Sequence, residues 1–249
     1  MMAAAEEPAR AAGSTRSWQD IWASRSIPPD GSHGLADLIA ADGYDNSYAA
    51  ISVQRWRDHA ARWAGILGVR SGDVVYEIGC GAGAFLACFR QMGCAVGGLD
   101  VSAALVGLAR RAIPDGNFRV GEATVLDAVG IADVVVANGS FLYFPSLEYA
   151  YQVTEAMVRA ARRAVAILDL PDETRRSAAI AARRAELGVA EYTRRYGGLD
   201  HRYFRREDMT RHLTDLGCAP VWTDDVRIEG YGNAGFRFDL VGFKAAADD

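Results

Sequence analysis

Runs of apolar residues alternate with amphipathic stretches along the middle of the chain, and this alternation predicts strands separated by helices. Strands are expected at residues 74–78, 95–99, 118–120, 132–137 and 164–168. Helices with one apolar face are expected at residues 84–92, 102–112 and 146–160. Because strands linked by helices form parallel sheets, the pattern predicts a parallel sheet with helices on both faces.

The C-terminal part of the chain predicts a different connection. A buried stripe predicts a helix over residues 206–216, and strands are expected at 222–228 and 236–241. The glycine-rich loop between these strands, 230–235, is too short for a parallel crossover, so the pair is antiparallel. The predicted fold class is therefore α/β and doubly wound, with a mostly parallel seven-stranded sheet that ends in an antiparallel strand pair.

The N-terminal part predicts helices that precede the sheet. Trp18, Ile21 and Trp22 share one face of a short helix that ends before the turn at 28–31. A longer amphipathic helix is expected over 46–67. We interpret all four tryptophans of these two helices as packing residues. Residues 1–15 are expected to be a disordered tail.

A second region without strand-and-helix alternation follows the fifth strand. An arginine-rich helix is expected over 172–187, whereas 192–204 is dense in aromatic residues and glycine and has no clear period. We interpret residues 172–204 as an insertion packed over the ligand edge of the sheet. Residues 16–249, which include this insertion, are expected to form a single domain.

Composition excludes several classes of function. Half of the 249 residues are hydrophobic, which is enough for a core without metal or disulfide support. The net charge of −5 argues against nucleic-acid and membrane partners. Four cysteines without CxxC spacing favour free thiols in a reducing cytoplasm, and four scattered histidines predict no metal site. No apolar run is long enough to span a membrane, and residues 1–13 do not have the pattern of a signal peptide.

The segment from Gly79 to Gly83 carries the most specific chemical signal. It lies between a buried strand and a helix, and its alternating glycines let the backbone approach a ligand closely. The following helix is expected to aim free N–H groups and a positive dipole end at that ligand. Gly79, Gly81 and Ala84 also match the dinucleotide pattern GxGxxG/A, with Asp100 placed 21 residues after Gly79.

Glu77 argues against a dinucleotide. This carboxylate, two residues before the first glycine, would repel a pyrophosphate but suits a ligand that carries an ammonium and a sulfonium. The third glycine stands at Gly83, which gives the form GxGxG. An NAD-dependent oxidoreductase therefore remains an alternative of lower rank.

Four segments in order then resemble the successive motifs of class I S-adenosylmethionine-dependent methyltransferases. They are Glu77–Gly83, Gly98–Ser102, Gly121–Ala123 and Asp133–Asn138. The resemblance covers roughly residues 44 to 243 and implies the Rossmann-like methyltransferase fold with S-adenosylmethionine as cofactor and S-adenosylhomocysteine as product. Many members of the family have Pro-Gly-Gly before the fifth strand, where this chain has residues 160–164, so the subfamily is not assigned.

The resemblance implies a role for each matching residue. The backbone of the turn, including Gly79, Cys80, Gly81 and Gly83, would hold the methionine part and the ribose, with Glu77 near the ammonium. Asp100 would accept both ribose hydroxyls, which a bidentate carboxylate suits. Val101, Glu122 and Ala123 would contact adenine, and Asn138 would contact the methionine part. Residues 16–68 would form a helical lid in which Tyr44 or Tyr48 covers the cofactor.

Substrate contacts are expected at the carboxyl ends of the parallel strands. The candidates are Tyr143, Asp169, Tyr192, Tyr196, His201, Tyr203, Tyr231 and Asn233. His201 is the first choice for a catalytic base because histidine titrates near neutrality, although a structural role is an equal alternative. Tyr143 is the second catalytic candidate, or it shapes the methyl channel. His59, on the expected polar side of its helix, and His212 are discounted.

The leading hypothesis is a methyltransferase that acts on an oxygen or nitrogen of a small organic molecule, such as a secondary metabolite. A protein or nucleic-acid methyltransferase is the first alternative, but residues 138–141 do not form an Asn-Pro-Pro-Tyr motif. A non-catalytic relative that binds the cofactor is the second alternative.

Overall fold

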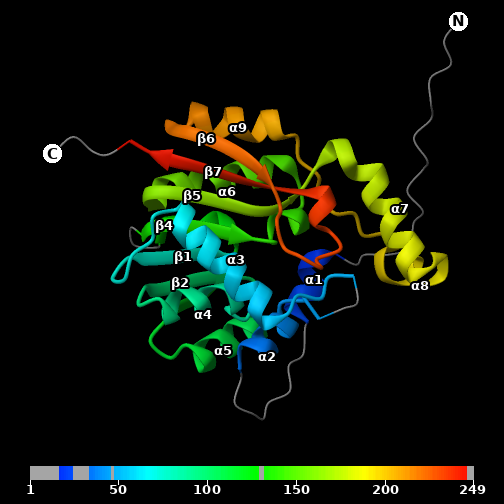
Figure 1. Cartoon of the computed structure of the whole chain (residues 1–249), viewed down its shortest axis with the longest axis horizontal. Helices are drawn as coiled ribbons and strands as arrows, with labels where there is room; N and C mark the ends of the chain where they lie inside the picture. Colours follow the sequence, from blue (N-terminus) through cyan, green and yellow to red (C-terminus); the bar gives the residue numbers. More distant parts are fainter. Residues whose placement is uncertain (1–16, 25–33, 46–47, 129–131, 246–249) are drawn as a thin grey trace, which may run out of the picture.

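The computed structural model describes residues 17–24, 34–45, 48–128 and 132–245 (Figure 1). The expected tail at 1–15, the turn at 28–31 and the expected helix start at Asn46 lie outside the described residues. In the part of the chain that the structure describes, no helix combines the length and the apolar character that crossing a membrane requires.

A seven-stranded sheet forms the centre of the molecule, in the order β3-β2-β1-β4-β5-β7-β6. The strands are β1 (Val74–Ile78), β2 (Ala95–Asp100), β3 (Asn117–Val120), β4 (Ala132–Asn138), β5 (Ala161–Pro171), β6 (Cys218–Asp225) and β7 (Arg237–Lys244). The first five strands pair in parallel, and β7 pairs antiparallel with both β5 and β6. The predicted doubly wound fold with its C-terminal antiparallel pair is confirmed.

Helices cover both faces of this sheet (Figure 1). The α-helices are α1 (Trp18–Ala23), α2 (Leu35–Ala41), α3 (Val53–Ile66), α4 (Ala84–Gln91), α5 (Ala103–Ala112), α6 (Leu147–Ala160), α7 (Arg176–Leu187), α8 (Val189–Tyr196) and α9 (Arg206–Asp215). Short 3-10 turns are η1 (Ala123–Ala128), η2 (Phe141–Tyr143), η3 (Glu173–Arg175) and η4 (Ala234–Phe236). Buried residues of α2 to α5 share one core with the sheet, and those of α6 and α9 share the other.

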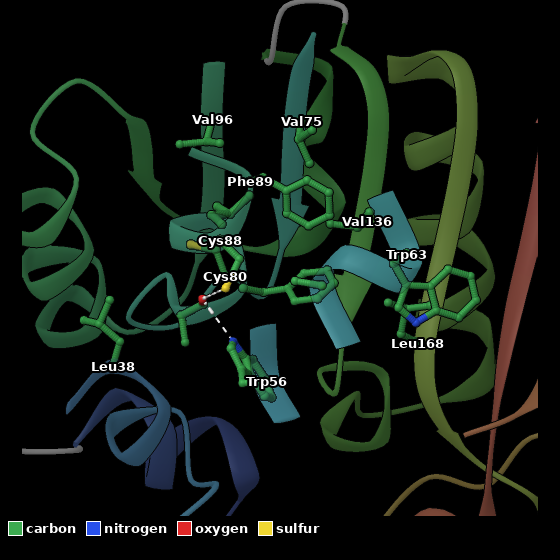
Figure 2. Close-up of a cluster of buried hydrophobic side chains, with 14 of the residues drawn as sticks. Leu38, Trp56, Trp63, Val75, Cys80, Cys88, Phe89, Val96, Val136 and Leu168 are labelled. Carbon is green, nitrogen blue, oxygen red and sulfur yellow. Dashed lines mark hydrogen bonds between the residues drawn. The ribbon is translucent and has the colours of Figure 1, made fainter. Parts of the chain in front are cut away.

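Helix α3 is fixed to the start of α4 by a large aromatic side chain (Figure 2). The indole Nε1 of Trp56 donates to the carbonyl oxygen of Ala84 at 3.0 Å, deep in the core. Trp63 lies two turns further along and stacks on Trp222 of β6. Helix α3 is therefore packed against the start of α4 and against the edge strand β6.

His59 is buried, so its expected place on the polar side of α3 was wrong. Only 4% of its surface is exposed, and it packs against the rings of Trp56, Trp63 and Phe85. Burial, together with the nearby Arg62 guanidinium, lowers the pKa of His59 to about 3. The ring therefore serves as a neutral core residue.

Several element boundaries differ from the prediction because tertiary packing sets them. The short helix α2 was not anticipated, and the expected helix over 46–67 begins only at Val53. Helix α8 occupies part of the stretch in which no period was found. Helices this short gain their stability from packing rather than from their own sequence. Strand β6 begins four residues before the predicted start at Trp222, because Cys218 pairs with Lys244 of β7.

Candidate active site

A cavity of about 590 Å³ lies at the carboxyl ends of β1, β2, β4 and β5. The sheet order reverses between β1 and β4, and ligands of open α/β sheets bind at such a reversal. Helix α1, the loop after α2, η2, the α7–α8 pair and the segment between β6 and β7 contribute further wall residues. Figure 1 shows α7 and α8 projecting beyond the sheet, with α1 between them and the strands.

Most of the expected site residues line this cavity. From the cofactor set these are Tyr44, Tyr48, Glu77, Gly79, Cys80, Gly81, Asp100, Val101, Glu122, Ala123 and Asn138. From the substrate set they are Tyr143, Asp169, Tyr196, His201, Tyr231 and Asn233. The lining also includes residues that no sequence pattern indicated as site residues: Trp18, Trp22, Asp42, Ser140, Arg183 and Arg237.

Three expected site residues lie outside the lining. Gly83 precedes α4 with φ +83°, and a Cβ there would lie 3.3 Å from the Cβ of Ala109, so this glycine lets α4 pack on α5. The ring of Tyr192 lies under the guanidinium of Arg184 and beside the ring of Tyr196, which does line the cavity. Tyr203 is buried and accepts a hydrogen bond from a lining residue instead of lining the cavity itself.

The first N–H group of α4 and one N–H group of the glycine turn are not free, contrary to expectation. The carboxylate of Asp42, in the loop after α2, accepts from the N–H of Ala82 at 2.6 Å and from the N–H of Ala84 at 3.2 Å. A Cβ on Gly81 would lie 2.2 Å from an Asp42 oxygen, so the glycine makes room for this contact. These two hydrogen bonds connect the loop after α2 to the glycine turn and to the start of α4.

Acidic side chains dominate this end of the cavity. Glu77 is 3% exposed, and its Oε2 has no hydrogen-bond partner among the described residues. Burial raises the pKa of Glu77 well above its usual range, and the charges of Asp42 and Asp100 raise it further. Three carboxylates around one glycine turn are complementary to a cationic ligand and repel an anionic one.

Asp100 is held at the end of β2 by two backbone donors. Its Oδ2 accepts from the N–H of Gly81 at 2.9 Å, and its Oδ1 accepts from the N–H of Ser102 at 2.8 Å. Burial raises the pKa of this carboxyl, while both hydrogen bonds oppose the rise. Each oxygen keeps a further acceptor site, so the carboxylate is pre-oriented to take two hydroxyl donors.

The opposite end of the cavity is aromatic. The indole of Trp18 stacks on the imidazole of His201, with ring centres 4.8 Å apart, and its Nε1 donates to the carbonyl of Asp200. Tyr143 lies 5.0 Å from Trp18 between ring centres, and Tyr196 meets His201 edge-on. Trp18 is thus part of the cavity wall, beyond the packing role that we expected.

The surroundings of His201 do not suit the expected role of a base. A guanidinium only donates hydrogen bonds, so the contact of 2.6 Å between Arg183 Nη1 and His201 Nδ1 assigns the ring proton to Nε2. Burial, with the charges of Arg183 and Arg237, lowers the pKa of His201 well below its usual range. His201 therefore offers an N–H donor at Nε2 and has no free lone pair for a proton.

Asp169 is a buried carboxylate in the cavity wall. It lies inside β5, at the irregularity between Ile167 and Leu170, in the left-handed region at φ +60°, a strained conformation for a residue with a side chain. Its Oδ2 accepts from the hydroxyl of Tyr231 at 2.8 Å and from Arg237 at 3.0 Å. Its Oδ1 is buried and has no partner among the residues that the structure describes. Burial raises the pKa of Asp169, and Arg237 and Tyr231 partly oppose this.

Asp239, behind Asp169, fixes this strained backbone. Asp239 is fully buried on β7, and its Oδ1 accepts from the N–H of Asp169 at 2.9 Å. Burial is the main reason that the pKa of Asp239 is raised to about 7, and the negative charge of Asp169 raises it further. The hydrogen bond from the Asp169 N–H and the charge of Arg62 both lower this pKa. The group consequently titrates near neutrality in the folded protein.

Replacing Asp239 by asparagine is expected to flatten the dependence of stability on pH. The folded pKa lies above the unfolded value of about 3.9, so the stabilisation from this group is complete below about pH 4. As the pH rises through about 7 this stabilisation is lost, and the free energy of unfolding falls by up to about 4 kcal/mol. The asparagine side chain keeps an oxygen for the Asp169 N–H but cannot titrate. Urea unfolding from about pH 4 to about pH 8 measures the difference; parallel curves for both proteins would contradict the assignment.

Comparison with known proteins identifies the type of domain. Residues 75–164 match the family model described as "Methyltransferase domain". A search of curated proteins by sequence finds no match. Within the described ranges, no group of three or more His, Cys, Asp and Glu side chains could hold a metal ion.

Solved structures with the same fold are distant in sequence. Magnesium protoporphyrin IX methyltransferase from Synechocystis PCC 6803, with bound S-adenosylhomocysteine, is 18% identical, and the match covers 85% of this chain and 98% of that chain with a TM-score of 0.57. An O-methyltransferase family protein from Burkholderia thailandensis is 17% identical over 85% of this chain and 60% of that chain, with a TM-score of 0.60. An amino pentose methyltransferase from Micromonospora echinaspora, with bound S-adenosylmethionine, is 15% identical. The match covers 76% of this chain and 92% of that chain, with a TM-score of 0.54.

Proposed function

Since this chain has the class I methyltransferase fold and carries a methyltransferase domain over residues 75–164, we propose that it transfers the methyl group of S-adenosylmethionine to an oxygen or nitrogen of a small organic molecule. The observation that supports this most directly is one continuous cavity, which joins the acidic glycine turn to an aromatic chamber. Two of the similar structures have names that state small acceptors, a magnesium porphyrin and an amino pentose.

The acidic end of the cavity fits S-adenosylmethionine. The unpaired Oε2 of Glu77 is a buried acceptor suited to the ammonium group, and the pre-oriented carboxylate of Asp100 suits the two ribose hydroxyls. The pyrophosphate of NAD would face the acidic side chains of Asp42 and Glu77, which disfavours the oxidoreductase alternative. Val101, Glu122 and Ala123 line the same end and are assigned to adenine.

When bound, the cofactor supplies a methyl group that the sulfonium has already activated. The chain has to hold the acceptor in line, exclude water and, for a protonated acceptor, remove a proton. We assign proton removal to Asp169, whose free Oδ1 faces no competing donor among the described residues. Tyr231 and Arg237 hold its other oxygen and so fix the orientation of the carboxylate. Tyr44, whose hydroxyl lies near Gly139 and whose pKa burial raises well above its usual range, is assigned with Tyr48 to the lid.

The enclosing wall supports a small acceptor over a protein or nucleic acid. Helix α1, η2 and α8 meet over the chamber through the rings of Trp18, Tyr143 and Tyr196. A macromolecular acceptor would need this wall to open. The four cysteines are buried and free, which supports the cytoplasm as the place of action.

The proposal is tested by calorimetric titration with S-adenosylmethionine and by incubation of a cell extract with methyl-labelled S-adenosylmethionine. We expect cofactor binding and label in small molecules. If label appears only in macromolecules, the small-molecule hypothesis is wrong and the protein is a protein or nucleic-acid methyltransferase. Binding without transfer to either fraction would favour a non-catalytic relative.

A further inference from the structure

Arg183 is a buried cation in the wall of the chamber. It lies on α7, is 6% exposed and lines the cavity. Its Nη2 donates to the hydroxyl of Tyr203 at 2.6 Å, its Nη1 to Nδ1 of His201 at 2.6 Å, and its Nε to the carbonyl of Ala179 at 3.3 Å. All three partners are neutral, since His201 is held in its uncharged form. The guanidinium is therefore oriented by hydrogen bonds without being neutralised.

No carboxylate of the described residues lies within 4.0 Å of this guanidinium. The other arginines of the cavity wall differ in this respect. Arg237 is paired with Asp169 at 3.0 Å, and Arg194 and Arg195 both bind Glu191. A guanidinium keeps its charge in proteins, and burial of an unpaired charge is costly. Arg183 is consequently the uncompensated positive charge of this wall.

The surroundings of Arg183 also define the shape of its counterpart. The guanidinium lies over the ring of Tyr196, with its carbon 5.6 Å from the ring centre. Beside it, His201 and Trp18 stack on each other with an interplanar angle of 17°, and Tyr143 packs against both rings. This group of rings gives the chamber an aromatic wall, which favours a ligand that lays a ring against it.

We propose that the methyl acceptor is a planar organic anion whose carboxylate, or a similar anionic group, pairs with Arg183 while its ring lies against Trp18 and Tyr143. This inference rests on the proposed function and specifies its acceptor. The cavity then has complementary ends: carboxylates at the glycine turn for the cationic cofactor, and a free guanidinium for the anionic acceptor. The anionic group acts as an anchor, and the methylated atom lies elsewhere on the acceptor.

The position of α7 separates this anchor from the cofactor. Helix α7 packs against α8, η3 and η4, all of which lie on the β5–β7 side of the reversal in strand order. The glycine turn, Asp100 and Glu122 follow β1, β2 and β3 on the other side. Because of this separation we assign Arg183 to the acceptor and not to the carboxylate of the cofactor's methionine part.

The test measures the preference for an acid over its neutral amide. Benzoate and indole-3-carboxylate, each against its primary amide, are titrated by calorimetry into the full-length protein with and without S-adenosylhomocysteine. At least one acid is expected to bind about tenfold or more tightly than its amide, as a charge-assisted bond to a desolvated guanidinium implies. If neither acid binds better than its amide, the proposal is overturned, and this comparison needs no variant.

Two variants of Arg183 and one control variant assign the preference to one residue. Arg183→Met keeps the length of the side chain and is expected to bring the acid-to-amide ratio to about one, whereas Arg183→Lys keeps part of the preference. Arg184→Met is the matched control, because Arg184 is exposed on the same helix and lies over Tyr192 outside the cavity; it is expected to leave the ratio unchanged. A thermal melt verifies that each variant is folded.

Three further outcomes are distinguishable. A preserved acid preference in Arg183→Met would overturn the assignment. Loss of S-adenosylhomocysteine binding in that variant would place the anchor at the cofactor and would also overturn it. Absence of cofactor binding in the wild type would defeat the proposed function, while the titrations without S-adenosylhomocysteine would still decide on the anion site.

Discussion

Replacing Asp100 by alanine is expected to weaken the binding of S-adenosylmethionine on the order of 100-fold. The carboxylate is held by the N–H groups of Gly81 and Ser102 so that both oxygens can accept a ribose hydroxyl. Each charge-assisted hydrogen bond contributes about 1.5–3 kcal/mol, and two of them give a change of at least this order. The same replacement frees the N–H of Gly81 and so loosens the glycine turn, which adds to the loss. Calorimetric titration with S-adenosylmethionine measures it.

Asp115→Ala is the matched control for this experiment. Asp115 is an exposed aspartate after α5 that pairs with Arg90 and takes no part in the cavity wall. We expect its removal to leave cofactor affinity within about twofold, because exposed ion pairs contribute little to stability. Affinity retained in Asp100→Ala would remove the ribose assignment, and with it the main physical link between β2 and the cofactor.

Replacing Asp169 by asparagine is expected to lower the rate of methyl transfer by on the order of 100- to 10,000-fold, while affinity for the cofactor stays the same. This range is the usual contribution of a positioned general base. Asparagine is one of the few residues with a side chain that tolerate the left-handed backbone at φ +60°, so this position inside β5 is expected to keep its conformation. Its amide oxygen still accepts from Tyr231, but no group remains that takes up a proton. Single-turnover kinetics with labelled S-adenosylmethionine separate this effect from product release.

Asp172→Asn controls for the loss of a buried carboxylate in the same region. Asp172 is 2% exposed and pairs with Arg206 at 2.8 Å, and it does not line the cavity. Its variant is expected to be less stable in a thermal melt but to turn over normally at low temperature. An unchanged rate in Asp169→Asn would show that the acceptor loses its proton without help from this carboxylate.

The order of the strands and the glycine turn could be predicted because their signals are local. A buried strand before Gly79, serines at the starts of α5 and α6, and apolar runs for β4 and β5 are each contained in a few neighbouring residues. Asp100 and Glu77 were found for the same reason, since both stand at a fixed distance from the turn.

The rest of the site depends on contacts between residues far apart in the chain. Asp42 reaches Ala82 across 40 residues, and nothing in its own neighbourhood indicates that it accepts N–H groups from the glycine turn and from the start of α4. His201 looked like a base because its residue type titrates near neutrality, but burial and Arg183 remove that property. Arg183 itself is one of many arginines in its region, and only its burial without a carboxylate distinguishes it.

The docking of α1 has a consequence for the order in which the molecule assembles. Helix α1 has six residues and no fully buried side chain, so it has little stability of its own. Its contacts are with residues made much later, since Trp18 bonds to Asp200 across 182 positions of sequence. The segment around Asp200 and His201 must therefore be in place before α1 has a surface on which to pack. Helix α1 is accordingly expected to become fixed late in folding, and the aromatic end of the chamber closes only then.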